Sequence, residues 1–151
     1  MSPKLIAFPE YRFERRGQKG KEHIFDPIRR KWVSATPEEV VRQHVLRALL
    51  DLGYPRGLTA VEKGFEAFGK MWRADVAVYD RNGKPLLLAE CKAPNVPIDQ
   101  HVFDQLARYN ASVGARFLLA TNGSVLLVAA LGDTSMEFLD HLPGYQDLIG
   151  R

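Results

Sequence analysis

Three charged residues, Asp75, Glu90 and Lys92, are of types that can bind a divalent cation and act on a phosphate. Hard cations such as Mg²⁺ take carboxylate oxygens and waters, often with only one or two protein carboxylates. A lysine beside such a cation can orient a water or stabilise charge that develops on a phosphate. These residue types therefore indicate a candidate metal site, provided that the fold brings them together.

A β-hairpin is predicted to bring them together. Strands are expected over residues 73–79 and 85–92, because both are rich in apolar residues and are bounded by turn signals. The Asn82-Gly83 dipeptide between them is the strongest short-range signal for a tight hairpin turn. We therefore expect a two-residue loop with Asn82 and Gly83 at its centre.

That loop fixes the pairing of the two strands. Asp75 falls opposite Glu90, and Arg73 falls opposite Lys92. Directly opposed side chains share a face of the sheet with Cβ atoms about 5 Å apart, and Lys92 shares that face because strands alternate with period two. The pairing predicts two carboxylates and an ammonium at one place on a sheet.

Two opposed carboxylates repel each other, and a bound cation would neutralise them. The alternative is that the strand ends at Glu90 and the charges face water, with Lys92 paired to Asp75 or Glu90. For these three residues alone, that structural interpretation is at least as strong as the functional one. The apolar run 86–89 favours a site, because charges at the end of a buried strand are costly without a partner.

A first helix is predicted to start after the N-cap Thr36 and to end at Gly53, with Glu39 completing a capping box. At 100° per residue, Glu38 falls within the apolar stripe and Glu39 on the outer face. An inward Glu38 could join the metal site. It could equally be a first-turn acid that the helix dipole favours.

A second helix is predicted over residues 99–113, where Gln105 and Tyr109 lie four positions apart on one face. They could contact a phosphate and position Lys92. The alternative is that Tyr109 fills the core and Gln105 lies at its rim.

Further strands are expected over residues 58–65, 116–120 and 125–131, and a small hairpin over residues 24–33. This order of elements predicts an α/β fold with a mixed central β-sheet flanked by helices. The stretch from Gly64 to Lys70 matches a phosphate-binding loop in its glycine and lysine positions. The required Ser/Thr is missing and a strand follows, so we expect a loop between two strands.

The chain has 151 residues, a net charge of +3 and one cysteine, Cys91. The length predicts one domain, and a lone cysteine excludes an internal disulfide framework and favours the reducing cytoplasm. The first 16 residues lack the apolar run of a secretion signal, and the longest apolar region, residues 117–131, is too short and too polar for a membrane span. We therefore expect no association with a membrane.

Positive charge is concentrated near the N-terminus. Residues 1–35 hold nine Lys/Arg and four Asp/Glu, whereas residues 36–151 hold twelve Lys/Arg and fourteen Asp/Glu. We expect a basic N-terminal arm over residues 1–23 and a single domain over residues 24–151. Such an arm attracts phosphate backbones, although a solvated tail is the commoner meaning of a charge cluster.

The sequence around these residues resembles the PD-(D/E)xK nuclease superfamily, and more closely the N-terminal nuclease domain of type I restriction enzyme R subunits in a small stand-alone version. The likeness runs from about residue 24 to residue 123. The segments that carry it are Ile24-Phe25-Asp26-Pro27, Thr36-Pro37-Glu38-Glu39, Leu52-Gly53-Tyr54-Pro55, Arg73-Ala74-Asp75, Glu90-Cys91-Lys92, Gln105-x-x-x-Tyr109 and Thr121-Asn122-Gly123.

The resemblance implies a restriction-endonuclease-like fold and a role for each matched residue. The implied catalytic residues are Glu38, Asp75, Glu90 and Lys92. Asp75, Glu90 and the Cys91 carbonyl would bind Mg²⁺, or Mn²⁺ as a substitute. Residues expected to bind or position nucleic acid are Gln105, Tyr109, Arg42 and Arg73.

The function so implied is Mg²⁺-dependent endonuclease action on DNA. The alternative is a non-catalytic module that binds DNA or a partner and keeps a nuclease-like fold. Full R subunits continue into an ATP-driven motor that this chain lacks, so a partner subunit that supplies a motor or specificity is expected. A second copy of this chain is a further candidate partner.

Overall fold

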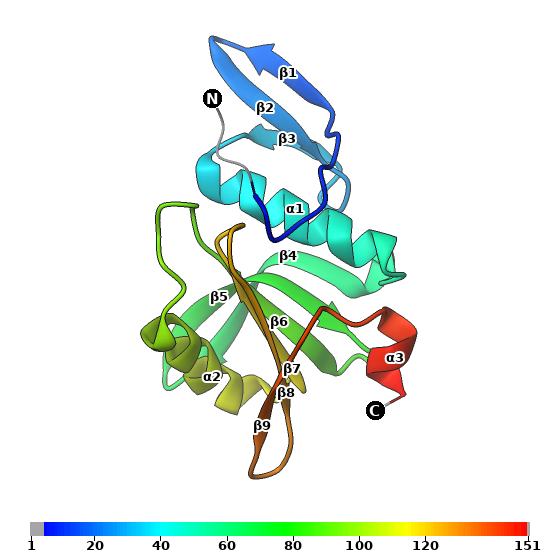
Figure 1. The fold of residues 1–151 in the computed structure, drawn as a ribbon, viewed down its shortest axis with the longest axis vertical. Coiled ribbons are helices and arrows are strands. Elements are labelled where there is room, and N and C mark those ends of the chain that lie inside the picture. Colours follow the sequence, from blue (N-terminus) through cyan, green and yellow to red (C-terminus); the bar gives the residue numbers. More distant parts are fainter. Residues whose placement is uncertain (1–4, 151) are drawn as a thin grey trace.

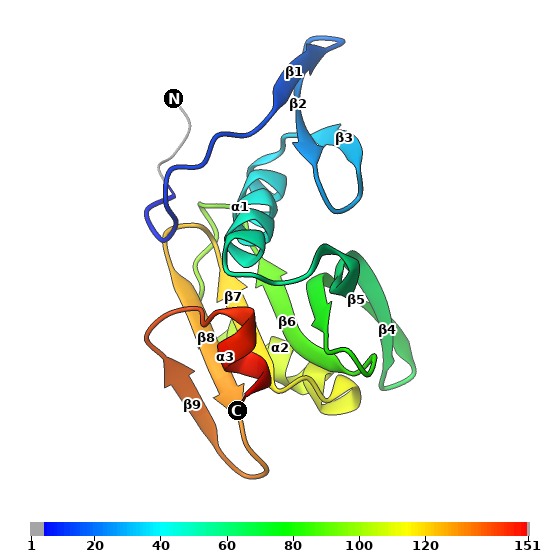
Figure 2. The ribbon, with the colours of Figure 1, turned by 90° about the vertical axis from the view of Figure 1, so that its right-hand side faces the viewer.

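The computed structural model describes residues 5–150, in which helix α1 lies between a small sheet and a large sheet (Figures 1 and 2). The small antiparallel sheet has the order β1-β2-β3 and consists of β1 (Arg15–Gln18), β2 (Lys21–Asp26) and β3 (Lys31–Ser34). The hairpin predicted over residues 24–33 is confirmed by the β2–β3 pairing. The proposed end of the N-terminal arm, residue 23, falls inside β2.

The large sheet has six strands in the order β4-β5-β6-β7-β8-β9. They are β4 (Thr59–Ala67), β5 (Lys70–Tyr79), β6 (Pro85–Cys91), β7 (Phe117–Thr121), β8 (Leu126–Leu131) and β9 (Met136–Leu139). Strands β6 and β7 are parallel, and all other neighbours are antiparallel. The predicted mixed sheet is therefore confirmed, with β9 as a strand that the sequence did not indicate.

The helices are α1 (Pro37–Asp51), the short 3₁₀ helix η1 (Arg56–Leu58), α2 (Gln100–Val113) and α3 (Tyr145–Ile149). Helix α1 begins as predicted, because the Thr36 hydroxyl accepts a hydrogen bond from the Glu39 N–H at 3.2 Å. The predicted capping box is wrong in its second half, because the Thr36 N–H bonds the Ser34 carbonyl at 2.9 Å and the Glu39 carboxylate binds Arg29 and Arg42 instead. Helix α2 starts after Asp99, whose carboxylate caps the Val102 N–H at 3.0 Å. Within residues 5–150, no helix has the length and apolar character needed to cross a membrane.

The two faces of the large sheet carry two apolar cores. Helices α1 and α3 cover one face, where Val45 and Tyr145 pack with Leu87 of β6. Helix α2 covers the opposite face, where Phe103 packs with Leu88 of the same strand. Because α2 connects the parallel strands β6 and β7, it must cross the sheet beside the end of β6.

The β5–β6 pairing agrees with the sequence, but the turn does not. Val76 pairs with Ala89 and Val78 with Leu87, which is the predicted register. The predicted two-residue loop is wrong, because the Asp80 N–H bonds the Lys84 carbonyl at 2.8 Å and the register shifts beyond Val78. The Asp80 carboxylate also accepts two backbone N–H groups inside the turn. This irregularity compensates for the longer turn and preserves the register near Asp75.

The alternation of side chains along β5 is broken at Asp75. Val76 packs in the core under α1, whereas Ala74 packs in the core under α2, although a regular strand would place both on one face. The neighbouring strand changes at the same level, because Glu62 of β4 has φ +53, in the left-handed region that residues other than glycine rarely adopt. Asp75 therefore lies at the phase change, which is the place where β4 and β5 switch the faces of the sheet to which their alternate side chains point.

Candidate active site

A cleft of about 260 Å³ lies beside β5, the end of β6 and α2. Its lining residues are Trp72, Arg73, Glu90, Lys92, Val102, Gln105, Leu106 and Tyr109. Five of these are residues that the sequence proposed for the site, namely Arg73, Glu90, Lys92, Gln105 and Tyr109. The structure therefore brings the end of the hairpin and the middle of α2 to one opening.

Glu90 and Lys92 form the charged floor of this cleft. The Lys92 Nζ lies 3.3 Å from the Glu90 Oε1, so the pairing that the structural interpretation expected is present. Burial and the negative charge of Asp75 raise the pKa of Glu90 to about 7, against the opposing effect of Lys92. The Lys92 ammonium thus offsets only part of the effect that burial and Asp75 have on the Glu90 carboxyl.

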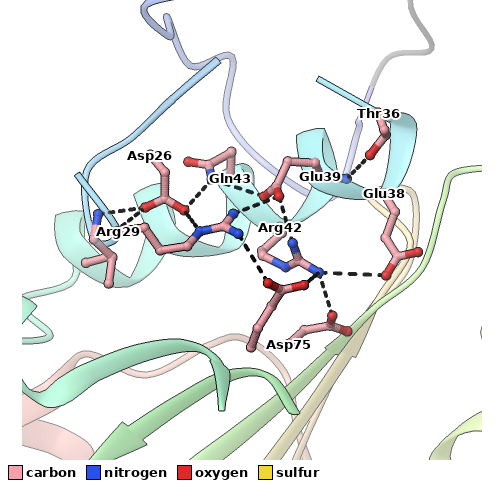
Figure 3. A network of polar contacts seen from close by, with 10 residues as sticks. Asp26, Arg29, Thr36, Glu38, Glu39, Arg42, Gln43 and Asp75 are labelled. Atoms are coloured by element: carbon pink, nitrogen blue, oxygen red, sulfur yellow. Dashed lines mark hydrogen bonds and ion pairs between the residues drawn. The ribbon is translucent and has the colours of Figure 1, made fainter. Parts of the chain in front are cut away.

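Asp75 is held from behind the cleft. Its Oδ2 accepts a hydrogen bond from the Cys91 backbone N–H at 2.7 Å. Its Oδ1 accepts one from the Arg42 Nη2 at 2.8 Å (Figure 3). Arg42 of α1 reaches Asp75 where β5 changes phase, whereas Glu90 lines the cleft beside α2. That the Asp75 and Glu90 side chains share a sheet face stays a prediction. The charge of Asp75 still acts on Glu90, and the separation of about 5 Å stays a prediction.

The two acids at the start of α1 are oriented opposite to the prediction. Glu39 is buried, with 7% of its surface exposed, whereas the Glu38 side chain is 49% exposed. The helical-wheel argument assumed that one apolar stripe faces the core, but the β2–β3 loop covers a second side of α1. Glu38 lies at the rim, where its Oε1 is 3.9 Å from the Arg42 Nη2 (Figure 3).

A chain of alternating acids and guanidinium groups connects the small sheet to Asp75 (Figure 3). The Arg29 Nε donates to Asp26 at 2.6 Å, and the Arg29 Nη2 donates to Glu39 at 2.7 Å. The Arg42 Nη1 donates to the same Glu39 oxygen at 2.8 Å, while its Nη2 holds Asp75. The position of Asp75 is therefore tied to residues about fifty positions earlier in the chain.

Two pKa shifts reflect this network. Burial alone would raise the pKa of Asp26, but hydrogen bonds from Arg29 and Gln43 lower it below its ordinary value. Burial alone would lower the pKa of Arg42, but the hydrogen bond to Asp75 and the charge of Glu39 raise it. Asp26 and Arg42 are therefore both held in their charged forms.

Sequence reasoning missed this network. Its one local signal is Asp26-Pro27, since an aspartate before a proline is typical of a side-chain-capped turn. The Asp26 carboxylate indeed accepts the Ile28 and Arg29 N–H groups at 2.7 and 2.8 Å. That signal predicts the turn but says nothing about Glu39 or Asp75.

An aromatic stack forms one wall of the cleft. The rings of Trp72 and Tyr109 lie 4.7 Å apart between centroids and are nearly parallel, at 7°. Tyr109 is half-buried, and it lines the cleft together with Gln105. Trp72 joins β5 to α2 in this way, a contact that the sequence did not indicate.

The acidic residues fit a hard cation in a water-rich site. A carboxylate offers about four lone pairs, and the contacts given for Asp75 use one on each oxygen. Glu90 has one close cationic partner and a raised pKa, which a nearby cation would lower. Among residues 5–150, no three His, Cys, Asp or Glu side chains gather as a complete metal cage. Two carboxylates with waters are enough for Mg²⁺, and the Cys91 carbonyl stays a predicted ligand.

Comparison with known proteins was made at the level of families and of solved structures. A family model described as type I restriction enzyme R protein N terminus (HSDR_N) matches residues 37–143. A solved structure of a fragment of a protein assigned as the HsdR subunit of a type I restriction enzyme from Vibrio vulnificus YJ016 is 21% identical, with a TM-score of 0.60. The match covers 76% of this chain and 25% of that one. No curated protein matches.

Proposed function

Because the chain belongs to the family of type I restriction enzyme R protein N termini, we propose that it is a Mg²⁺-dependent endonuclease domain that hydrolyses phosphodiester bonds in DNA. The observation that carries the proposal is the cleft, where Glu90, Lys92, Gln105 and Tyr109 meet in front of Asp75. The α/β fold, similar to the HsdR fragment, is compatible with it.

Each residue has a role that its position allows. Asp75, Glu90 and the Cys91 carbonyl would hold Mg²⁺ or Mn²⁺, which when bound activates a water and neutralises charge on the phosphate. The Lys92 ammonium, one-third exposed in the cleft, stabilises the charge that develops on the phosphate oxygens. The raised pKa of Glu90 reflects negative charge that the cation would neutralise, so Glu90 acts as a metal ligand in its ionised form.

Other residues position these groups or the nucleic acid. The Gln105 amide and the Arg73 guanidinium reach the cleft and can donate to phosphate oxygens. Arg42 holds Asp75 and is itself buried, so its role is positioning. Glu38 lies on the α1 side of Asp75, where its carboxylate is 3.9 Å from the same Arg42 nitrogen that binds Asp75.

A second candidate function is a non-catalytic module that binds DNA or a partner subunit. One observation favours it. The Arg42 guanidinium forms an ion pair with Asp75 at 2.8 Å, so the charge of this carboxylate is compensated without a metal ion. Either function is compatible with action beside a partner subunit that supplies a motor or specificity, or with a second copy of this chain.

Nicking of supercoiled plasmid separates the two functions. The purified chain should nick plasmid with Mg²⁺ or Mn²⁺, and Lys92→Ala should lose at least about 100-fold in rate with little change in DNA affinity. Lys84→Ala, which removes an exposed lysine from the β5–β6 turn, is the matched control and should nick normally. If wild type at stoichiometric amounts leaves the plasmid intact with both metals, the chain alone is not a nuclease.

A further inference from the structure

The tip of the β4–β5 hairpin exposes two large apolar side chains. Phe68 is 61% exposed and Met71 is 73% exposed. Met71 lies across the neighbouring strand, since a Cβ placed on Gly64 would come within 3.2 Å of the Met71 methyl group. Within residues 5–150, β5 has β4 as its paired strand at this level, because pairing with β6 begins only at Val76. The tip therefore projects beyond the body of the sheet.

Phe68 occupies a backbone position that its side chain disfavours. It forms the two-residue turn between Ala67 and Lys70 together with Gly69, and the φ angles are +53 and +75. Positive φ at both central residues is the requirement of a type I′ turn, which strongly prefers Asn, Asp or Gly at the first position. An exposed phenylalanine there is unfavourable both for the backbone and for hydration, which points to a role in binding.

Unpaired positive charge surrounds the tip. Lys63, Lys70 and Arg73 form no ion pair within 4.0 Å with a carboxylate of residues 5–150. The Arg108 guanidinium lies 5.3 Å from the centre of the Phe68 ring. Glu66 is the one acid of this hairpin end, so the surface is cationic around an apolar centre. That combination is complementary to nucleic acid more than to an apolar or cationic protein face.

The tip is held at a defined distance from the cleft. Trp72, on the same strand, stacks on Tyr109 of α2 and also lies 6.0 Å from the Phe65 ring. Trp72 lies two strand residues beyond Lys70, where the turn that contains Phe68 closes, so the tip is roughly 10 Å along the strand from Trp72, or about three base-pair steps of a duplex. A duplex with a phosphate at the cleft can therefore reach the tip.

We infer that Phe68, supported by Met71, is an apolar wedge that inserts between stacked bases of duplex DNA while the surrounding cations hold the backbone. Proteins that bind and bend DNA use phenylalanine and methionine in this way, and the unstacked step kinks the duplex. The inference rests on the proposed function for its ligand, and it assigns to the hairpin tip a part in binding that the metal site does not need. An asparagine at position 68 would relieve the strained backbone, but it would also remove the apolar side chain that inserts between bases.

The wedge is tested by two measurements, stability and affinity for duplex DNA, which should change in opposite directions when Phe68 is replaced. Phe68→Asn relieves the turn and should raise the melting temperature on the order of 2–4 °C, while weakening binding to a duplex on the order of tenfold. Lys19→Asn is the matched control, because Lys19 and Gly20 have φ +54 and +75 in the β1–β2 hairpin. It should raise stability similarly, with a much smaller loss of binding. Phe68→Trp keeps the aromatic ring and should keep the affinity.

Binding is measured in EDTA with a duplex that carries 2-aminopurine, whose fluorescence rises on unstacking. Wild type should raise this fluorescence and Phe68→Asn should not. If wild type binds without the rise and Phe68→Asn binds equally well, the wedge is refuted and a protein-docking tip takes its place. Nicking without any dependence on Phe68 overturns this inference alone. Phe68-dependent binding without nicking overturns the endonuclease proposal alone.

Discussion

Replacing Glu90 with Gln should change the pH dependence of stability in a defined direction. In the folded protein, burial and the charge of Asp75 raise the pKa of Glu90 from 4.5 to about 7. In the unfolded chain the carboxyl returns to its ordinary value. Between pH 4.5 and pH 7 the folded state therefore holds a proton that the unfolded state has lost, and the free energy of unfolding falls as pH rises through this window.

The size of the effect follows from the shift. Each pKa unit corresponds to about 1.4 kcal/mol, so the full window corresponds to about 3 kcal/mol at most. The Glu90 side chain is 19% exposed, and the ion pair with Lys92 is lost in the variant, so we expect about 1–3 kcal/mol. Glu90→Gln cannot ionise. It should therefore match wild type near pH 4.5 and exceed it in stability at pH 8.

Urea unfolding in EDTA at pH 5, 6, 7 and 8 measures this difference. The control is Glu137→Gln on β9, which removes an exposed acid outside the cleft and leaves the Glu90 site intact. Addition of Mg²⁺ at pH 8 should reduce the difference in the free energy of unfolding between Glu90→Gln and wild type, because a cation that binds only the native state stabilises wild type. A difference between Glu90→Gln and wild type that does not vary with pH would refute the electrostatic argument for the site.

Three further results are expected. Mg²⁺ or Mn²⁺ should raise the melting temperature of wild type and not of Asp75→Asn, and an equal shift in both would count against a metal at this carboxylate. Arg42→Met leaves Asp75 and Glu39 without their shared partner, so it should cost about 3–5 kcal/mol in urea unfolding, and a loss below about 1 kcal/mol would contradict the network. If the basic N-terminal region contacts phosphates, Lys21→Gln and Lys31→Gln should each reduce the slope of log affinity against log salt by about one. An unchanged slope would show that these lysines are only solvated.

The sequence predicted those parts of the fold whose signals are local. The N-cap Thr36, the N-cap Asp99 and the strands that frame Glu90 all depend on neighbouring residues or on simple periodicity. The short elements β9 and α3 escaped, because four or five residues carry too little periodicity to be separated from loop. The turn at residues 80–84 was mispredicted because Asp80 offers its carboxylate to the backbone and outweighs the Asn-Gly signal.

The candidate site was predictable only where a strand or helix repeats regularly. Lys92 lies two residues after Glu90, and Tyr109 four after Gln105, so each pair shares a face and meets in the cleft. The orientation of Glu39 was not predictable, because Arg29 reaches it from another sheet. The phase change at Asp75 has no sequence signal either, since it depends on the backbone of the neighbouring strand at Glu62.

The residues that line the cleft lie close together in the sequence, whereas the contacts that hold Asp75 behind it join distant segments. This difference affects which parts of the protein open first. Trp72, Lys92 and Tyr109 belong to one continuous stretch around β5, β6 and α2, so their meeting requires only short loop closures. The Arg42–Asp75 pair and the docking of the small sheet join more distant segments. We expect the small sheet to open as a separate unit in native-state hydrogen exchange, while the amides of β6 and β7 and of α1, which packs in the core, stay protected until global unfolding. In that partly open state the cleft persists and Glu39 is released from Arg29.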